Sequence, residues 1–334
     1  MSLSLNRRAL LGAGIAASLS HAHAAESETL VLYNGQHRTT TEALVAAFKQ
    51  MTGISVTVRN GESSALAGQL IEEGALTRAD LFYSEVSPPI AALEEKGQLL
   101  PIEPDTLKQV PSRYVARTGA WVGASVRVRV VGYNKAMLTP AQLPSSVLDF
   151  ATSAWKGRIA FAPKDGFQEQ IMAIQHIKGR NAAVAWLRGL RENGRMYNGN
   201  SAAVRAMEVG EVAAVLTNNY YWYSLARERG SDSMKSVLHY FDRTDVGAIQ
   251  CVSAAGILKS SARPALAQRF IAFMISEAGQ AAIAGSVAEY PVRPGVISPF
   301  PLPPLDQVAA APVLPADFGS AADAYAMQRD AGMA

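Results

Sequence analysis

Three short polar runs stand directly after apolar stretches that have the length of a buried strand. They contain His37, then Glu85, then the adjacent pair Tyr220 and Tyr221. In a two-lobed α/β protein, the carboxyl ends of the strands converge on the cleft between the lobes, where ligands bind. We therefore expect one imidazole, one carboxylate and two phenols to face a common space.

The two tyrosines are the most informative of these residues because they are adjacent. Neighbouring residues on a helix point about 100° apart, so both phenols cannot belong to one apolar stripe. Asn218 or Asn219 would make a good N-cap, which places Tyr220 and Tyr221 in the first turn of the following helix. At that position the helix dipole favours phenolate over phenol.

These residue types together suit a hard, highly charged metal ion. A phenol has an ordinary pKa of about 10, so it binds well at neutral pH only where a strong Lewis acid displaces its proton. Fe³⁺ meets that requirement, because hard cations prefer oxygen donors. Glu85 would supply a carboxylate oxygen and His37 an imidazole nitrogen. Three anionic oxygens would match the charge of Fe³⁺.

Each residue also has a simpler interpretation. A Tyr-Tyr-Trp run is more often used for packing or for an interface than for metal ligation. A single histidine after a strand is usually a hydrogen-bonded loop residue. Glu85 precedes Pro88 and Pro89, which is typical of a carboxylate at the start of a helix.

The segments around these runs predict an α/β fold, because strand-like and helix-like patterns alternate along the chain. The pattern runs through Leu30–Tyr33, Thr39–Met51, Ile54–Arg59, Ala65–Glu73, Ala79–Tyr83, Arg127–Tyr133, Val147–Ala151, Ile159–Ala162, Gln168–Lys178, Ala182–Glu192, Ala202–Val209, Ala213–Leu216, Asn219–Arg229 and Cys251–Leu258. We expect one helical stretch over Pro264–Ala284, an extended proline-rich connector over 291–315, and a short terminal helix within 316–334.

Length and composition limit the class of protein. A chain of 334 residues with 49% hydrophobic and 18% charged residues is globular and long enough for two lobes. A net charge of +3 without a basic stripe gives no indication of nucleic-acid binding. The single cysteine, Cys251, excludes an internal disulfide and a cysteine-based zinc site.

The first 25 residues have the pattern of an export signal. Arg7 and Arg8 precede a short apolar run that ends in Ala22-His23-Ala24, and this run is too short to span a bilayer. The arginine pair is also compatible with a twin-arginine signal. We expect cleavage near Ala24 or Ala25 and a mature protein outside the cytoplasm that does not span the membrane.

Several longer motifs carry a family resemblance. The mature chain resembles the periplasmic ferric-ion-binding proteins, the substrate-binding components of ferric iron ABC transporters. The matching runs, in the same order, are Val31–His37, Leu66–Gly74, Ala79–Glu85, Asn218–Trp222, Ala226–Gly230 and Ala288–Val292. The resemblance implies a two-lobed periplasmic-binding-protein fold, each lobe a mixed or parallel sheet flanked by helices, with the ligand cleft between the lobes.

The resemblance also implies roles for particular positions. In that family the residues at His37, Glu85, Tyr220 and Tyr221 bind Fe³⁺ as the transported ligand. It implies a monomer that closes around iron and is recognised by an inner-membrane ABC permease. The expected lobes are residues 26–128 with 250–300 and residues 129–249 with 301–334.

The sequence departs from the family at the place where many members hold a phosphate-like anion beside the iron. Val86 follows Glu85, where many members have glutamine, and Lys164–Phe167 replaces a Ser-Gly-Ala loop. Asp165 would repel an anion unless Lys164 or the iron itself offsets it. We therefore expect a different or weaker anion than phosphate, such as carbonate, or water in its place.

Five residues are candidates for anion or supporting contacts. Asn200 and Asn218 match anion contacts of the family, and Gly166 lies in the altered loop. Two side chains are alternative occupants of the anion position, namely Asp165 and Tyr133.

The sequence leaves two alternatives to iron transport. A binding protein for an organic solute would use Tyr220 and Tyr221 for stacking, but it would have no reason to keep all four iron ligands. An exported zinc hydrolase would use His37 and Glu85, but the mature chain contains neither an H-E-x-x-H helix nor a G-x-S-x-G turn. We therefore expect a transport protein without catalytic activity.

Overall fold

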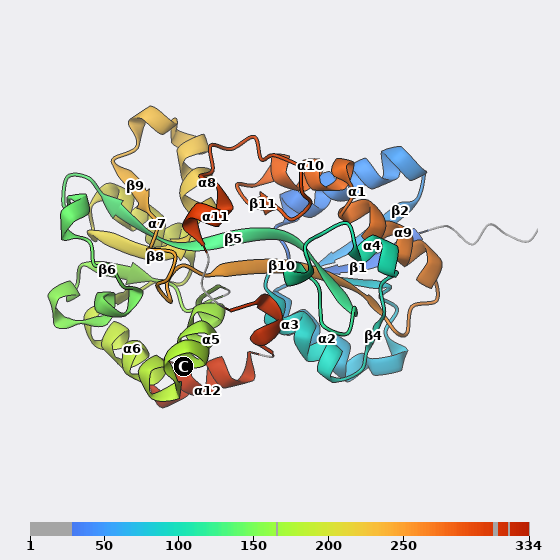
Figure 1. Ribbon diagram of the computed structural model, residues 1–334, viewed down its shortest axis with the longest axis horizontal. Coiled ribbons are helices and arrows are strands. Elements are labelled where there is room, and N and C mark those ends of the chain that lie inside the picture. Colours follow the sequence, from blue (N-terminus) through green and yellow to red (C-terminus); the bar gives the residue numbers. More distant parts are fainter. Residues whose placement is uncertain (1–28, 165, 310–312, 320, 334) are drawn as a thin grey trace, which may run out of the picture.

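The structure is a computed structural model, and it describes residues 29–164, 166–309, 313–319 and 321–333. The expected export signal therefore lies outside the described residues, and so does Asp165. Figure 1 shows two groups of strands and helices placed side by side along the long axis, with the strands β5 (Trp121–Asn134) and β10 (Gln250–Leu258) running between them. In the described ranges, no helix has the length and apolar character needed to cross a membrane.

The first group of strands forms a mostly parallel sheet near the N-terminal end. Its elements are β1 (Thr29–Asn34), α1 (Arg38–Thr52), β2 (Ser55–Asn60), α2 (Ser63–Glu73), β3 (Leu81–Ser84), α3 (Ser87–Glu95), β4 (Leu99–Leu100) and α4 (Pro104–Leu107). Strand β1 pairs in parallel with β2 and β3, and β10 pairs antiparallel with β3. Leu30, Leu32 and Leu81 are fully buried between this sheet and its helices.

The second group repeats this plan farther along the chain. Its elements are β6 (Ile159–Phe161), α5 (Gly166–Lys178), α6 (Arg180–Asn193), β7 (Arg195–Met196), α7 (Asn200–Val209), β8 (Ala214–Asn218), α8 (Asn219–Arg229) and β9 (Ser236–His239). Strand β6 pairs in parallel with β7 and β8, while β8 and β9 pair antiparallel with β5. The predicted α/β fold with mixed sheets is confirmed.

Strand β5 belongs to both sheets and is the main structural link between them. Its first half pairs with β10, and its second half, from Arg129, pairs with β8. All 14 of its residues are buried, as expected for a strand that is covered on both faces. Arg127 and Arg129 are exceptions in this apolar strand, and a buried charge requires partners.

One predicted helix is interrupted. The stretch expected over Pro264–Ala284 is divided into α9 (Pro264–Met274) and α10 (Glu277–Ser286). Ser276 begins the second helix, because its hydroxyl oxygen accepts a hydrogen bond of 3.2 Å from the amide of Gly279. The prediction of one continuous helical stretch was therefore wrong. The pattern of apolar residues does not reveal a serine hydroxyl that caps a second helix.

The C-terminal part returns across both groups of strands. It contains β11 (Tyr290–Pro291), α11 (Leu305–Val308) and α12 (Ala322–Asp330). Leu305 packs against the hydrophobic core that contains Leu32 and Leu81, whereas Met327 packs in the core of the second group. The expected lobe boundaries stay a prediction.

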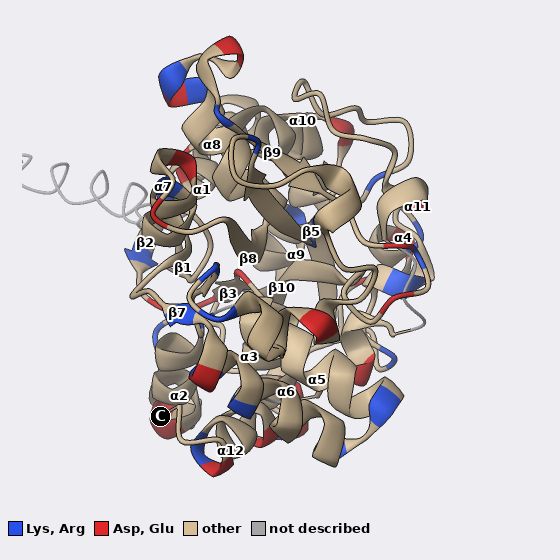
Figure 2. Ribbon diagram, turned by 90° about the vertical axis from the view of Figure 1, so that its left-hand side faces the viewer, with Lys and Arg blue, Asp and Glu red and all other residues tan. Residues whose placement is uncertain are grey.

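Charged residues of both signs are mixed over the outer helices and loops. In the view of Figure 2, lysines and arginines alternate with acidic residues, and neither sign covers a continuous face. The charges that decide the chemistry are instead the few buried ones near the middle of β5.

Candidate metal centre

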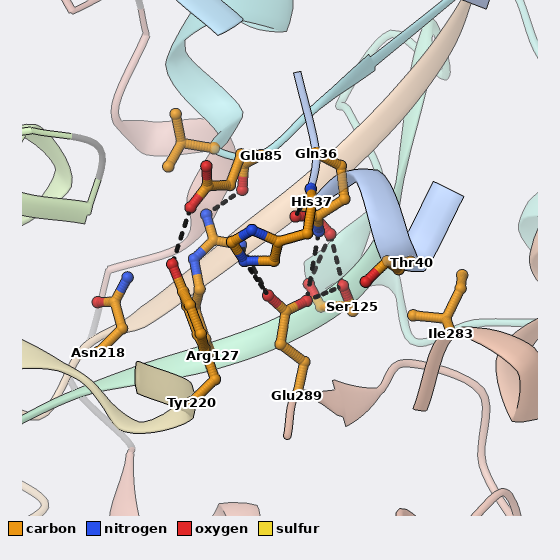
Figure 3. A network of polar contacts seen from close by, with 12 residues as sticks. Gln36, His37, Thr40, Glu85, Ser125, Arg127, Asn218, Tyr220, Ile283 and Glu289 are labelled. Carbon is orange, nitrogen blue, oxygen red and sulfur yellow. Dashed lines mark hydrogen bonds and ion pairs between the residues drawn. The ribbon is translucent and has the colours of Figure 1, made fainter. Parts of the chain in front are cut away.

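The four side chains predicted as ligands lie at the carboxyl ends of three strands and meet at one point. His37 precedes α1, Glu85 follows β3, and the two tyrosines occupy the first turn of α8. Tyr220 Oη donates a hydrogen bond of 3.0 Å to Glu85 Oε1 (Figure 3). The ring centroid of Tyr220 lies 4.8 Å from that of His37 and 4.2 Å from that of Tyr221. The structure therefore brings these four residues together, and their role as ligands stays a prediction.

The site has a buried side and an open side. Tyr220 and Glu85 are buried, whereas the side chain of His37 keeps 27% of its exposure and Tyr221 is half-buried. A ligand could therefore reach the phenols and the imidazole from the side of His37 and Tyr221. Among the described residues, no three His, Cys, Asp or Glu side chains form a metal-binding group.

The two asparagines at the start of α8 hold the tyrosines in place, but not by the expected cap. Asn218 is the N-cap residue, yet its side chain makes no capping hydrogen bond. Its Oδ1 accepts a hydrogen bond of 3.0 Å from Arg129 Nη1 instead. Asn219 Oδ1 accepts from the amide of Val128, and its Nδ2 donates to the carbonyl of Ala288. These bonds fix the start of α8 against β5.

Two buried residues of the site were missed as functional candidates in the sequence. Arg127 donates from Nη2 to the backbone carbonyl of Glu85, and its Nη1 lies 3.7 Å from Glu289 Oε1. Glu289 Oε1 also lies 3.8 Å from His37 Nε2, so one carboxylate faces both the arginine and the histidine (Figure 3). The sequence did contain a signal for Arg127, namely an arginine within the apolar run of β5. Arginine is almost never buried unless it is paired, so its position indicates a buried acidic partner.

Burial and the clustered charges change the acidity of the site. Burial raises the pKa of Glu85, and nearby Glu289 adds to the rise while Arg127 opposes it. Burial also raises the pKa of Tyr220 well above its ordinary value, and the Glu85 carboxylate adds to this. Burial alone would lower the pKa of Arg127, but Glu289 and Glu85 outweigh it and raise that pKa. Without a metal, Tyr220 therefore holds a proton that a metal would have to displace, and burial favours the protonated form of Glu85 as well.

The candidates for anion contacts are only partly brought together. Gly166 begins α5 and lies against Asn218, whose Nδ2 has no hydrogen-bond partner within the described part of the chain. Asn200 is buried at the start of α7, where its Oδ1 accepts a hydrogen bond of 3.3 Å from Thr217. Tyr133 is not brought to this site, because it packs in the hydrophobic core of the second group of strands.

The contact between Gly166 and Asn218 leads to a stability prediction. A Cβ at residue 166 would lie 2.8 Å from Asn218 Oδ1, so Gly166→Ala must displace the amide that Arg129 contacts. We expect the free energy of unfolding to fall by about 1 to 3 kcal/mol, as for other overpacked sites. Urea denaturation measures this. Gly68→Ala is the control, because a Cβ there meets nothing within 4 Å, and equal stability of the two variants would contradict the prediction.

Comparison with known proteins identifies the family. The family model described as "Bacterial extracellular solute-binding protein" matches residues 43–316. The chain belongs to this family. The solute-binding protein is 40% identical over 322 residues to the "Major ferric iron-binding protein" of Neisseria meningitidis, a match that covers 96% of this chain and 97% of the relative.

Two further matches support the resemblance found in the motifs. The solute-binding protein is 35% identical to the "Fe(3+)-binding periplasmic protein" of Serratia marcescens, covering 95% of this chain and 94% of the relative. The crystal structure of iron-bound HitA from Pseudomonas aeruginosa matches with a TM-score of 0.88 and 44% identity. That match covers 91% of this chain and 99% of HitA. The predicted resemblance to periplasmic ferric-ion-binding proteins and the two-lobed fold are thereby confirmed.

Proposed function

We propose that this solute-binding protein binds ferric iron in the periplasm and delivers it to an inner-membrane ABC permease. The observation that carries the proposal is the pair of a phenol and a carboxylate from different sheets, Tyr220 and Glu85, in contact at 3.0 Å. His37 and Tyr221 lie beside this pair and complete a set of four donors. The relatives named above are iron-binding proteins, which supports the same cargo for this chain.

The donor set suits Fe³⁺ for electrostatic reasons. When Glu85 and both phenols lose their protons, three anionic oxygens face the cargo, and together they balance its charge. Arg127 stays protonated behind them, where it compensates Glu289 and holds the backbone of Glu85. The imidazole of His37 adds a neutral donor. A companion anion, carbonate or phosphate, would lie on the side of Asn218 and Gly166.

Closure of the lobes would couple iron binding to transport. Tyr220 and Tyr221 extend from the second sheet, while His37 and Glu85 extend from the first, so a bound ion would hold the two sheets together. A ligand that binds only the closed form shifts the population toward it. We propose that the permease recognises this closed monomer, with residues 26–128 and 250–300 forming one lobe and residues 129–249 and 301–334 the other.

Iron affinity is expected to fall on acidification. Burial raises the pKa of Glu85 and of Tyr220 and so favours their protonated forms, which means that protons compete with iron for these oxygens. A falling pH favours the protonated, iron-free form, and affinity should drop about tenfold per pH unit for each proton displaced. Competition with a hydroxamate chelator between about pH 6 and pH 8 measures the iron affinity. Proton release in a pH-stat measures the number of protons that iron displaces. An affinity that does not change with pH would contradict this prediction.

The proposal is tested by the iron content of the purified protein. Ferrous ammonium sulfate is oxidised in air with bicarbonate as the added anion, and unbound metal is removed by gel filtration. We expect the unchanged protein to keep iron and the double variant Tyr220→Phe/Tyr221→Phe to lose it. Tyr133→Phe is the matched control and should keep iron, because Tyr133 lies in the hydrophobic core. Equal iron contents in all three proteins would overturn the assigned site.

A further inference from the structure

A buried glutamate of the second group of strands contacts the first group close to the proposed iron site. Glu169 lies in α5, and its side chain is completely buried. Its Oε1 accepts a hydrogen bond of 3.3 Å from the backbone amide of Ser87 and another of 3.1 Å from the hydroxyl group of the same residue. Ser87 is the first residue of α3, so these bonds join a helix of one group to a helix of the other.

The two bonds cap α3 from outside its own sheet. The first amides of a helix lack partners within the helix, and the N-cap residue of α3 is Val86, whose side chain has no acceptor. The carboxyl group of Glu169 supplies the missing acceptor. Ser87 is itself fully buried, so loss of Glu169 would leave a buried amide without its partner.

The capped residue lies two positions after Glu85, one of the four proposed ligands. The backbone of Glu85 is held on both sides, because its amide donates a hydrogen bond of 3.0 Å to Ser63 Oγ and its carbonyl accepts from Arg127. Ser63 begins α2 of the first group, and Arg127 lies in β5, which belongs to both sheets. Glu169 adds a contact to the same short segment from a helix of the second group.

We propose that Glu169 is a positioning residue for iron binding, which holds the segment that carries Glu85 in the geometry that the metal requires. The inference rests on the proposed function and adds to it a residue that is not a ligand. Glu169 and Tyr220 both extend from the second group, so the contact with Ser87 forms only when the two groups are together. Closure around iron therefore fixes the carboxylate ligand and the phenol ligand in the same step.

A double-mutant cycle with Glu85 tests whether Glu169 acts through this ligand. Glu169→Ala should lower the iron affinity about tenfold, because two hydrogen bonds to the segment are lost. Glu85→Ala should lower it more, because a ligand is lost. When Glu85 is already alanine, the further change Glu169→Ala should have no effect on the affinity. Competition with a hydroxamate chelator gives the iron affinity of all four proteins.

Two milder variants keep the test independent of folding. Glu169→Gln retains a carbonyl oxygen that can accept from the amide and the hydroxyl group of Ser87, so it should recover most of the affinity lost in Glu169→Ala. Ser87→Ala removes the hydroxyl bond but keeps the amide bond, so its loss of affinity should be smaller than that of Glu169→Ala.

Asp80→Ala is the matched control. Asp80 is also a buried carboxylate that accepts from a backbone amide, that of Val31, and from a serine hydroxyl, that of Ser261. It precedes β3, however, whereas Glu85 follows that strand, so these contacts lie at the opposite end. Asp80→Ala should lower the free energy of unfolding in urea and leave the iron affinity unchanged.

The outcomes separate this inference from the proposed function. Additive losses in the double variant, or equal losses of affinity in Glu169→Ala and Asp80→Ala, would overturn the inference, because the effect would then be one of general stability. Unchanged affinity in Glu169→Ala, or a Glu169→Gln protein as weak as Glu169→Ala, would also overturn it. A Glu85→Ala protein that binds iron as tightly as the unchanged protein would instead overturn the assigned iron site, and this inference with it.

Discussion

Tyr221→Phe is expected to lower the affinity for ferric iron by more than about 100-fold. Substitution of a residue that only hydrogen-bonds to a metal ligand already lowers metal affinity by about 10- to 100-fold, and loss of a ligand itself should cost more. The substitution removes only the phenol oxygen. The phenyl ring can keep its contact with Tyr220, whose centroid lies 4.2 Å away, and Tyr221 is half-buried, so the fold should be unaffected. Competition with a hydroxamate chelator measures the affinity, and urea denaturation of the iron-free protein confirms that stability is unchanged.

The same measurement on a second variant tests which ligand contributes more to the iron affinity. His37→Ala should weaken iron binding less than Tyr221→Phe does, because imidazole is a neutral donor and contributes no charge compensation. The ring of His37 also lies on the exposed side of the site, where water can replace it. Equal losses in the two variants would contradict the argument that the three anionic oxygens dominate the binding.

Arg127→Met is expected to destabilise the iron-free protein by about 3 to 5 kcal/mol, the usual effect of leaving a buried charge without its partner. Arg127 and Glu289 are both fully buried, and the arginine also holds the backbone carbonyl of Glu85. Removal of the cation leaves the Glu289 carboxylate without its compensating charge. Urea denaturation gives the change in the free energy of unfolding.

Two further variants separate charge from packing. Arg127→Met/Glu289→Leu should recover part of the lost stability, since it replaces both members of the buried pair. Arg205→Met removes an arginine from an exposed pair with Glu228, and its unfolding midpoint should stay almost unchanged. A stable Arg127→Met protein would show that the buried cation is not required by its neighbours.

The sequence was most informative about features that depend on neighbouring residues, such as strand ends and helix starts. Polar residues after apolar runs predicted that His37, Glu85 and Tyr220 follow strands. The parallel pairing of β1 and β3 brings the ends before His37 and Glu85 together, whereas β8, which precedes Tyr220, pairs with β6 in the second group of strands. The start of α8 was also predictable, because an asparagine before an aromatic run is a local signal. Secondary structure and strand ends depend on neighbours along the chain, so one sequence suffices for them.

Contacts between distant segments were not predictable in this way. The pairing of Arg127 with Glu289 joins β5 to the segment after α10, and no spacing rule connects them. Asn218 or Asn219 was expected to cap α8, but Arg129 binds the side chain of Asn218 instead, because a buried guanidinium must find an acceptor. Tyr133 follows a strand-like run as the four predicted ligands do, yet tertiary packing places it in the core. The partners of these side chains depend on which surfaces of the strands and helices are buried in the completed fold.

The visible absorption spectrum of the purified protein, before and after addition of ferric iron at neutral pH, tests the central claim most directly. Phenolate bound to Fe³⁺ absorbs visible light, whereas zinc and most organic solutes would leave the protein colourless. We predict a broad band near the middle of the visible range that is absent from Tyr220→Phe/Tyr221→Phe and present in Tyr133→Phe. A protein that stays colourless with ferric iron, or a band that persists without both phenols, would contradict the assignment of Tyr220 and Tyr221 as ligands.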